Sequence, residues 1–105
     1  MVMNAEVAVF GTLRFPPENI EGVLPHLRTF VRATQDHDGC ILYEVALDPF
    51  DPGLIRFAEL WPDRKSLEEH LIAPHIGPWR EQSKRFGLIE RVFDSYDISA
   101  ESIPV

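Results

Sequence analysis

Two kinds of hydrophobic periodicity alternate along this chain, and their order limits the folds open to it. Apolar residues recur every three or four positions at 18–36 and at 63–86, where Pro74 divides the stretch into two helical pieces. The β-rich runs lie at residues 6–15, 40–47, 54–61 and 88–98. This β-α-β-β-α-β order predicts an α+β, ferredoxin-like fold, in which an antiparallel four-stranded sheet carries its helices on one face. We assign residues 1–98 to this single domain and residues 99–105 to a C-terminal tail.

Turn-forming residues mark the ends of these elements. Gly39 and Gly87 each follow a helical stretch, and Asp63 is a good N-cap for the second one. The segment 48–53 is dense in Asp, Pro and Gly, which predicts a long-looped hairpin between the second and third strands. Pro25 falls on the polar side of the first helix, so it either kinks that helix outward or marks its true first turn.

The strands are apolar on both faces. Val7, Val9 and Leu13 of the first strand point to one face. Ala8 and Phe10 point to the other. Two helices cover only one face of a sheet, so the second face is expected to pack against the same face of another subunit. The sequence therefore predicts a homodimer closed into a dimeric α/β barrel.

Charge and composition exclude several classes of partner. The 105 residues have a formal net charge of -7, and the ten basic residues are scattered, which argues against nucleic acid and against anionic membrane surfaces. An apolar run of about 20 residues, as a membrane-spanning helix requires, is absent. The single cysteine, Cys40, cannot form an internal disulfide, and the first residues lack the order of a secretory signal. A cytoplasmic location is expected.

Candidate chemistry concentrates between positions 59 and 79. This segment contains Glu59, Trp61, His70, His75 and Trp79. The tryptophans either belong to the core or wall a cleft for a flat aromatic molecule, and the histidines are either hydrogen-bonded surface groups or candidate general bases. A histidine is favoured over the glutamate as base, because its ordinary pKa lies near neutral pH. The five-residue spacing of the histidines, interrupted by a proline, does not match a two-histidine metal motif, so we expect no metal.

Three further residues have ambiguous roles. Tyr43 either points its hydroxyl into a pocket or stands in the sheet, and the residue type of Arg14 does not decide its role. Cys40 has no neighbouring histidine to activate it and is expected to be structural. The chain contains neither a Gly-rich phosphate loop nor a nucleotide fingerprint, so no cofactor is expected.

Several short motifs together resemble a known family. They are Gly39-Cys-Ile-Leu-Tyr43, Asp51-Pro-Gly53, Glu59-Leu-Trp61, His70 and Ala73-Pro-His75. In order and spacing they are similar to the antibiotic biosynthesis monooxygenase (ABM) domain along nearly the whole chain. The resemblance implies a homodimer with a pocket in each protomer, and oxygenation of quinols or anthrones by dioxygen, often without metal or flavin.

Mapped onto this sequence, the resemblance implies a division of roles. Glu59 and Trp79 are candidate substrate-binding residues by their place in the 59–79 segment. By the resemblance, Trp61 would line the pocket, His70 or His75 would act as base or hydrogen-bond partner, and Tyr43 and Arg14 would steady a developing oxyanion. These assignments rest on the family pattern.

Other functions remain open on the same fold. A non-catalytic dimer that binds a small aromatic or lipid-like molecule is the main alternative, and a purely structural dimer or a lactone isomerase is also compatible. Haem-degrading relatives use an asparagine on the first strand, which the stretch Gly11 to Arg14 lacks. Haem chemistry is therefore disfavoured.

Overall fold

The strands and helices follow the predicted order. The computed structural model describes residues 4–99 and 101–105, so residues 1–3 of the expected domain and residue 100 of the expected tail lie outside the description. The elements are β1 (Val7–Arg14), a 3-10 turn η1 (Pro17–Asn19), α1 (Ile20–His37), β2 (Leu42–Leu47), β3 (Leu54–Trp61), α2 (Arg64–His70), α3 (Ile76–Arg85) and β4 (Glu90–Asp97). The strand order is β2-β3-β1-β4, and every neighbouring pair is antiparallel. The ferredoxin-like α+β fold is confirmed.

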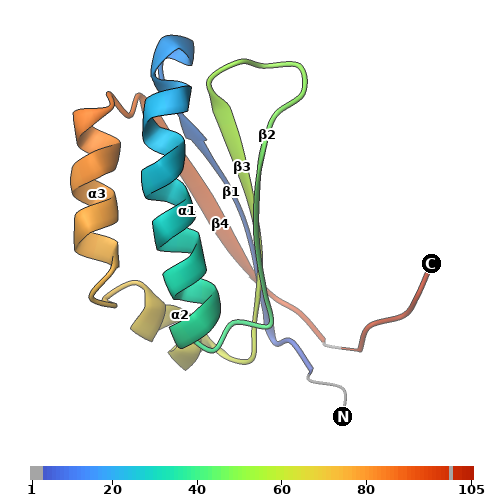
Figure 1. Ribbon diagram of the computed structural model, residues 1–105. Coiled ribbons are helices and arrows are strands. Elements are labelled where there is room, and N and C mark those ends of the chain that lie inside the picture. Colours follow the sequence, from blue (N-terminus) through green and yellow to red (C-terminus); the bar gives the residue numbers. More distant parts are fainter. Residues whose placement is uncertain (1–3, 100) are drawn as a thin grey trace.

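The fold has two layers. Figure 1 shows α1 and α3 side by side on one face of the sheet, with α2 below them, while the opposite face carries no helix within the described residues. Residues 101–105 are exposed and extend away from the sheet (Figure 1). None of the helices in the described part of the chain is both long enough and apolar enough to span a membrane.

The helix α1 supplies much of the core. Its buried stripe includes Val23, Leu27 and Phe30, which recur at helical spacing. Pro25 lies inside the helix and is exposed, and the helix begins five residues before it at Ile20. The alternative that Pro25 marks the first turn is therefore wrong. A proline on the solvent side removes one backbone hydrogen bond there without disturbing the buried face.

Strand register decides which side chains face the helices. Val9 of β1 pairs with Glu59 of β3, which in turn pairs with Tyr43 of β2. All three are buried on the helix-covered face. Their neighbours alternate to the opposite face, where Phe10 pairs with Ala58. Because β1 and β3 are the central strands of the sheet, one row of side chains from each of them lies beneath the helices.

Candidate active site

An apolar cavity lies between the sheet and the helices. Its volume is about 600 Å³. The sheet contributes Tyr43 and Phe57 to its wall, and the helices contribute Phe30 and Trp79. The rings of Phe30 and Trp79 are stacked, with centroids 5.6 Å apart and planes inclined by 14°. A cavity of this size with aromatic walls suits a flat, drug-sized organic molecule.

Two histidines share one carboxylate beside this cavity. The Oδ2 atom of Asp38 lies 2.6 Å from Nδ1 of His70 and 2.7 Å from Nε2 of His75. An ionised carboxylate only accepts hydrogen bonds, so both of these ring nitrogens carry a hydrogen. The side chains of Asp38 and His70 are 7% and 4% exposed, so water does not replace these bonds. We refer to Asp38, His70 and His75 as the carboxylate-bridged triad.

Local structure explains how the triad forms. Asp38 is the C-cap of α1, His70 is the last residue of α2, and His75 is the N-cap of α3. The predicted N-cap of α2 is confirmed, because Asp63 accepts a hydrogen bond of 2.8 Å from the backbone of Ser66. Three helix ends therefore meet at one carboxylate. Pro74 separates the last two of them, as its missing N–H requires.

The triad contains the donor types that bind metals. Its ligand atoms lie within 4.8 Å of one another, and two imidazoles with a carboxylate would suit a divalent transition metal. Tetrahedral zinc, with bonds of about 2.0 to 2.1 Å, would hold neighbouring ligand atoms roughly 3.3 Å apart. The two N···O distances are much shorter than this. The observed geometry is that of a hydrogen-bonded triad.

His70 has one ring nitrogen left for the cavity. Its Nδ1 is bonded to Asp38, and its ring belongs to the cavity wall. Burial lowers the pKa of His70, and this outweighs the opposing effect of Asp38. The imidazole is therefore neutral at neutral pH, with Nε2 as a hydrogen-bond and proton acceptor.

Glu59 is the second ionisable group in the wall. It is 3% exposed, and its Oε1 accepts a hydrogen bond of 2.9 Å from Nε1 of Trp61. Burial raises the pKa of Glu59 to about 7, although Trp61 and Arg91 oppose the shift. A carboxyl group in this state exchanges a proton near neutral pH, which the sequence alone did not indicate.

Two other buried groups stay protonated. Burial raises the pKa of the Tyr43 hydroxyl, and the negative charge of Glu59 adds to the effect. Burial also raises the pKa of Cys40, which is free and half-buried. Tyr43 can therefore donate a hydrogen bond to a ligand, and Cys40 is not activated as a nucleophile.

The structure gathers only part of the predicted site in the cavity wall. His70, Glu59, Tyr43 and Trp79 line it. Trp61 is fully buried behind the wall, with its ring 4.9 Å from that of His70, so it supports the cavity and does not border it. Among the described residues, His75 does not line the cavity. It is joined to His70 through the carboxylate of Asp38.

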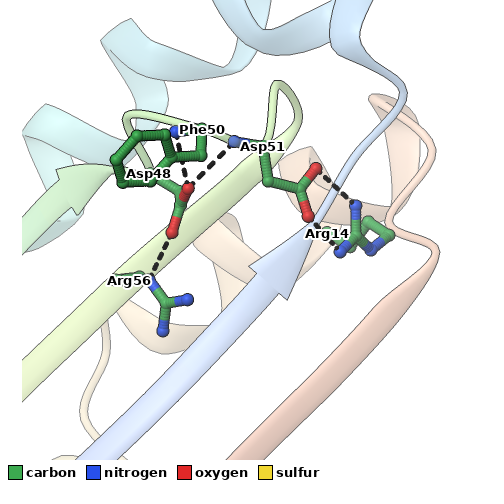
Figure 2. A network of polar contacts seen from close by, with 5 residues as sticks. All are labelled: Arg14, Asp48, Phe50, Asp51 and Arg56. Carbon is green, nitrogen blue, oxygen red and sulfur yellow. Dashed lines mark hydrogen bonds and ion pairs between the residues drawn. The ribbon is translucent and has the colours of Figure 1, made fainter.

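Arg14 lies on the other face of the sheet. Leu13 borders the cavity, so alternation turns Arg14 away from it. Its guanidinium makes two hydrogen bonds, of 3.1 and 2.8 Å, with Asp51 in the β2–β3 loop. Figure 2 shows this pair beside Asp48, which accepts hydrogen bonds from Arg56 and from the backbone of the loop. Arg14 thus lies apart from the cavity wall, and its ion pair ties the end of β1 to the β2–β3 loop.

Sequence reasoning missed Asp38 and the cationic residues Arg80, Lys84 and Arg91, whose side chains border the cavity. Asp38 precedes Gly39 at the end of a helical stretch and gives no separate signal. The only hint of the cationic residues in the sequence is the four-residue spacing of Arg80 and Lys84. Basic residues on a solvent-exposed helix face have the same spacing, so it does not mark a site.

Comparison with known proteins identifies the family. The sequence profile of antibiotic biosynthesis monooxygenases (ABM) matches residues 6–82. The chain belongs to the ABM family. A crystal structure from Deinococcus radiodurans that carries this family name has 26% identity and a TM-score of 0.85, covering 94% of this chain and 97% of that one. A crystal structure of an antibiotic biosynthesis monooxygenase has 28% identity and a TM-score of 0.81, covering 89% and 98%.

A curated relative also matches this ABM chain. The uncharacterized protein sll1783 of Synechocystis sp. (strain ATCC 27184 / PCC 6803 / Kazusa) is 26% identical over 77 residues. The match covers 73% of this chain and 52% of that protein, so the chain spans about half the length of this relative. The family and its fold are thus established, and the substrate has to be inferred from the geometry of the site.

Proposed function

We propose that this ABM-family chain oxidises a small aromatic quinol or anthrone-like substrate with dioxygen, without a cofactor. The observation that carries the proposal is the orientation of His70, whose Nδ1 is fixed on Asp38 while its ring borders an apolar cavity of about 600 Å³. This arrangement favours a general base, because the carboxylate selects the tautomer and stabilises the imidazolium that forms. His75, on the same carboxylate, is proposed to hold Asp38 in place.

The chemistry needs only a base, an apolar site and the substrate's own electrons. His70 Nε2 takes a proton from the substrate, and the resulting electron-rich anion reduces dioxygen and forms a carbon–oxygen bond. The peroxide takes up a proton. Loss of the proton that remains on that carbon then cleaves the O–O bond, so one oxygen atom becomes the new carbonyl and the other leaves as water. Exclusion of bulk water by Phe30, Phe57 and Trp79 favours these steps.

Glu59 and Tyr43 are proposed to bind the substrate oxygens. Both line the cavity, and both can donate a hydrogen bond when protonated. Such donors stabilise negative charge that develops on a phenolic or peroxide oxygen. Trp61, which bonds Oε1 of Glu59, orients this carboxyl group from behind the wall.

The same proposal includes a homodimer. Phe10 and Tyr96, which are 56% and 53% exposed, have ring centroids 6.3 Å apart on the sheet face without helices. Val92 adds a further exposed apolar side chain to that face. An aromatic patch on a small domain favours burial against a second copy, consistent with the dimeric barrel that the family resemblance implies.

The direct test is oxygen uptake by metal-stripped protein with a panel of quinols and anthrones. We expect uptake that falls by about 10²- to 10⁴-fold in His70→Ala. The variant His37→Ala, which alters an exposed histidine of α1, is the matched control and should retain full activity. Binding of panel members without any oxygen uptake would instead support the non-catalytic binding dimer.

A further inference from the structure

Three cationic side chains surround the mouth of the cavity. Arg80 and Lys84 lie four residues apart on α3, and Arg91 lies on β4. All three border the cavity and are exposed. Long basic side chains in this position line an apolar wall with their stems and hold their charges at its edge. We call these three residues the cationic rim.

The cationic rim runs against the charge of the whole chain. The sequence carries 17 acidic and 10 basic residues, with a formal net charge of -7. The acidic residues that border the cavity are Glu59 in the wall and Asp94 on β4. Three cations against one exposed carboxylate therefore make a local positive region on an acidic protein, and such a region attracts anions to a cleft.

The rim charges are not neutralised by ion pairs. Arg14, Arg56 and Arg64 each pair with an aspartate at 2.6 to 2.9 Å. Within the described residues, the rim cations have no carboxylate within 4.0 Å. Their charges are thus available to a ligand.

The rim also acts on the interior of the site. The guanidinium of Arg91 lies 4.3 Å from the centroid of the Phe93 ring, which fixes it beside the cavity. Its charge opposes the rise in the pKa of Glu59, and the charge of Arg80 adds to the lowering of the pKa of His70. Both cations are therefore close enough to influence the ionisable groups in the cavity wall.

We infer that the ligand of this cavity is a planar, apolar ring system that carries a carboxylate or a similar anionic group, with the rings between Phe30 and Phe57 and the anion at the cationic rim. The inference rests on the proposed function for the role of this ligand as substrate. The anion remains partly hydrated at the mouth, so its attraction to the rim is not cancelled by full desolvation. The same positive region stabilises the anion that His70 would create.

Binding of a matched pair of probes tests this inference without turnover. The probes are 9-anthracenecarboxylate and 9-anthracenemethanol, which share one ring system and differ in charge. Their dissociation constants are measured anaerobically by quenching of tryptophan fluorescence, since Trp79 borders the cavity. We expect the carboxylate to bind about tenfold more tightly than the alcohol at low ionic strength. This preference should shrink in about 0.5 M salt.

Variants assign the preference to the rim. In the triple variant Arg80→Gln, Lys84→Gln, Arg91→Gln, the carboxylate should lose its advantage while the alcohol binds within about twofold of the original. Arg91→Lys keeps the charge and should keep the preference. Arg85→Gln removes an exposed cation of α3 that does not border the cavity, and it should change nothing.

Two results would overturn the inference. One is equal binding of acid and alcohol by the original protein, and the other is an acid preference that survives in the triple variant. Both results can be measured even if the protein consumes no oxygen. Conversely, a protein that prefers the acid but shows no oxygen uptake with acidic or neutral substrates would sustain this inference and remove the proposed reaction.

Discussion

Trp61 donates its indole N–H to Glu59, two residues earlier on the same face of β3, over 2.9 Å. The Trp61 ring lies 4.9 Å from that of His70, and Glu59 presents a buried carboxyl group in the cavity wall. This pair joins a structural tryptophan to an ionisable group whose pKa is raised to about 7. It therefore makes both stability and activity sensitive to pH.

Glu59→Gln should stabilise the protein at alkaline pH. Because the folded-state pKa of Glu59 is raised from 4.5 to about 7, its contribution to stability is complete below pH 4.5 and is lost as pH rises through 7. Glutamine keeps the acceptor for Trp61 and cannot ionise. We expect the change in unfolding free energy caused by the substitution to be more stabilising at pH 8 than at pH 4, by up to ~3 kcal/mol. Urea unfolding at fixed protein concentration measures this, and an equal effect at both pH values would contradict it.

Asp38→Asn should weaken both the fold and the proposed reaction. It removes the charge that accepts hydrogen bonds from His70 and His75, which costs about 1 to 3 kcal/mol of unfolding free energy. With the tautomer of His70 no longer fixed, kcat should fall about 10- to 100-fold with a smaller change in KM. The control is Asp36→Asn, an exposed neighbour on α1.

Nitrogen chemical shifts of the imidazoles provide a readout that stability alone would not change. We expect the original protein to show His70 protonated at Nδ1, as the bond to Asp38 requires. A spectrum with His70 protonated only at Nε2 would refute its role as a base facing the cavity.

Phe10→Asp should disrupt the proposed dimer. Phe10 lies at the centre of the sheet face without helices, beside Tyr96, and a carboxylate there opposes burial of that face. We expect the dissociation constant of the dimer to rise at least about tenfold in sedimentation velocity experiments.

Phe50→Asp is the matched control for the dimer experiment. Phe50 is 92% exposed, and it lies in the β2–β3 loop, outside the strands that form that sheet face. This variant should sediment as the original protein does. Monomers in the original protein at all concentrations would remove the dimer from the proposal.

Gly11→Ala should reshape the cavity through Phe93. A Cβ atom at position 11 would lie 2.2 Å from Cδ2 of the Phe93 ring, so that ring must move. Because Phe93 borders the cavity, probe binding should weaken, with a loss of about 1 to 3 kcal/mol in unfolding free energy from overpacking. Gly77→Ala has nothing within 4 Å of the new atom and should leave probe binding unchanged. The measurement is the dissociation constant of the probe for each of the two variants.

Much of the fold could be predicted because it depends on local patterns. The strand Leu54–Trp61 was predicted at its true limits, and Asp63 was recognised as an N-cap, since periodicity and capping act within a few residues. Pro25 shows the limit of such rules. Eighteen residues of helix and a buried stripe outweigh the loss of one hydrogen bond, and α1 continues through the proline.

The site was less predictable because its parts come from separate elements. His70, Glu59, Tyr43 and Trp79 were selected by residue type, and the tertiary structure brings these four together in one wall. Arg14 was also selected by type, yet strand alternation turns it to the opposite face.

By itself, then, the sequence determined the order of strands and helices, the apolar character of both sheet faces and the family, because each is written in local periodicity or in short motifs. Only the tertiary structure decided that Asp38 bridges two histidines and that three cations meet at one cavity. These contacts join residues up to 37 positions apart, and their energies depend on distance and burial in space. Spacing along the chain carries no information on either quantity.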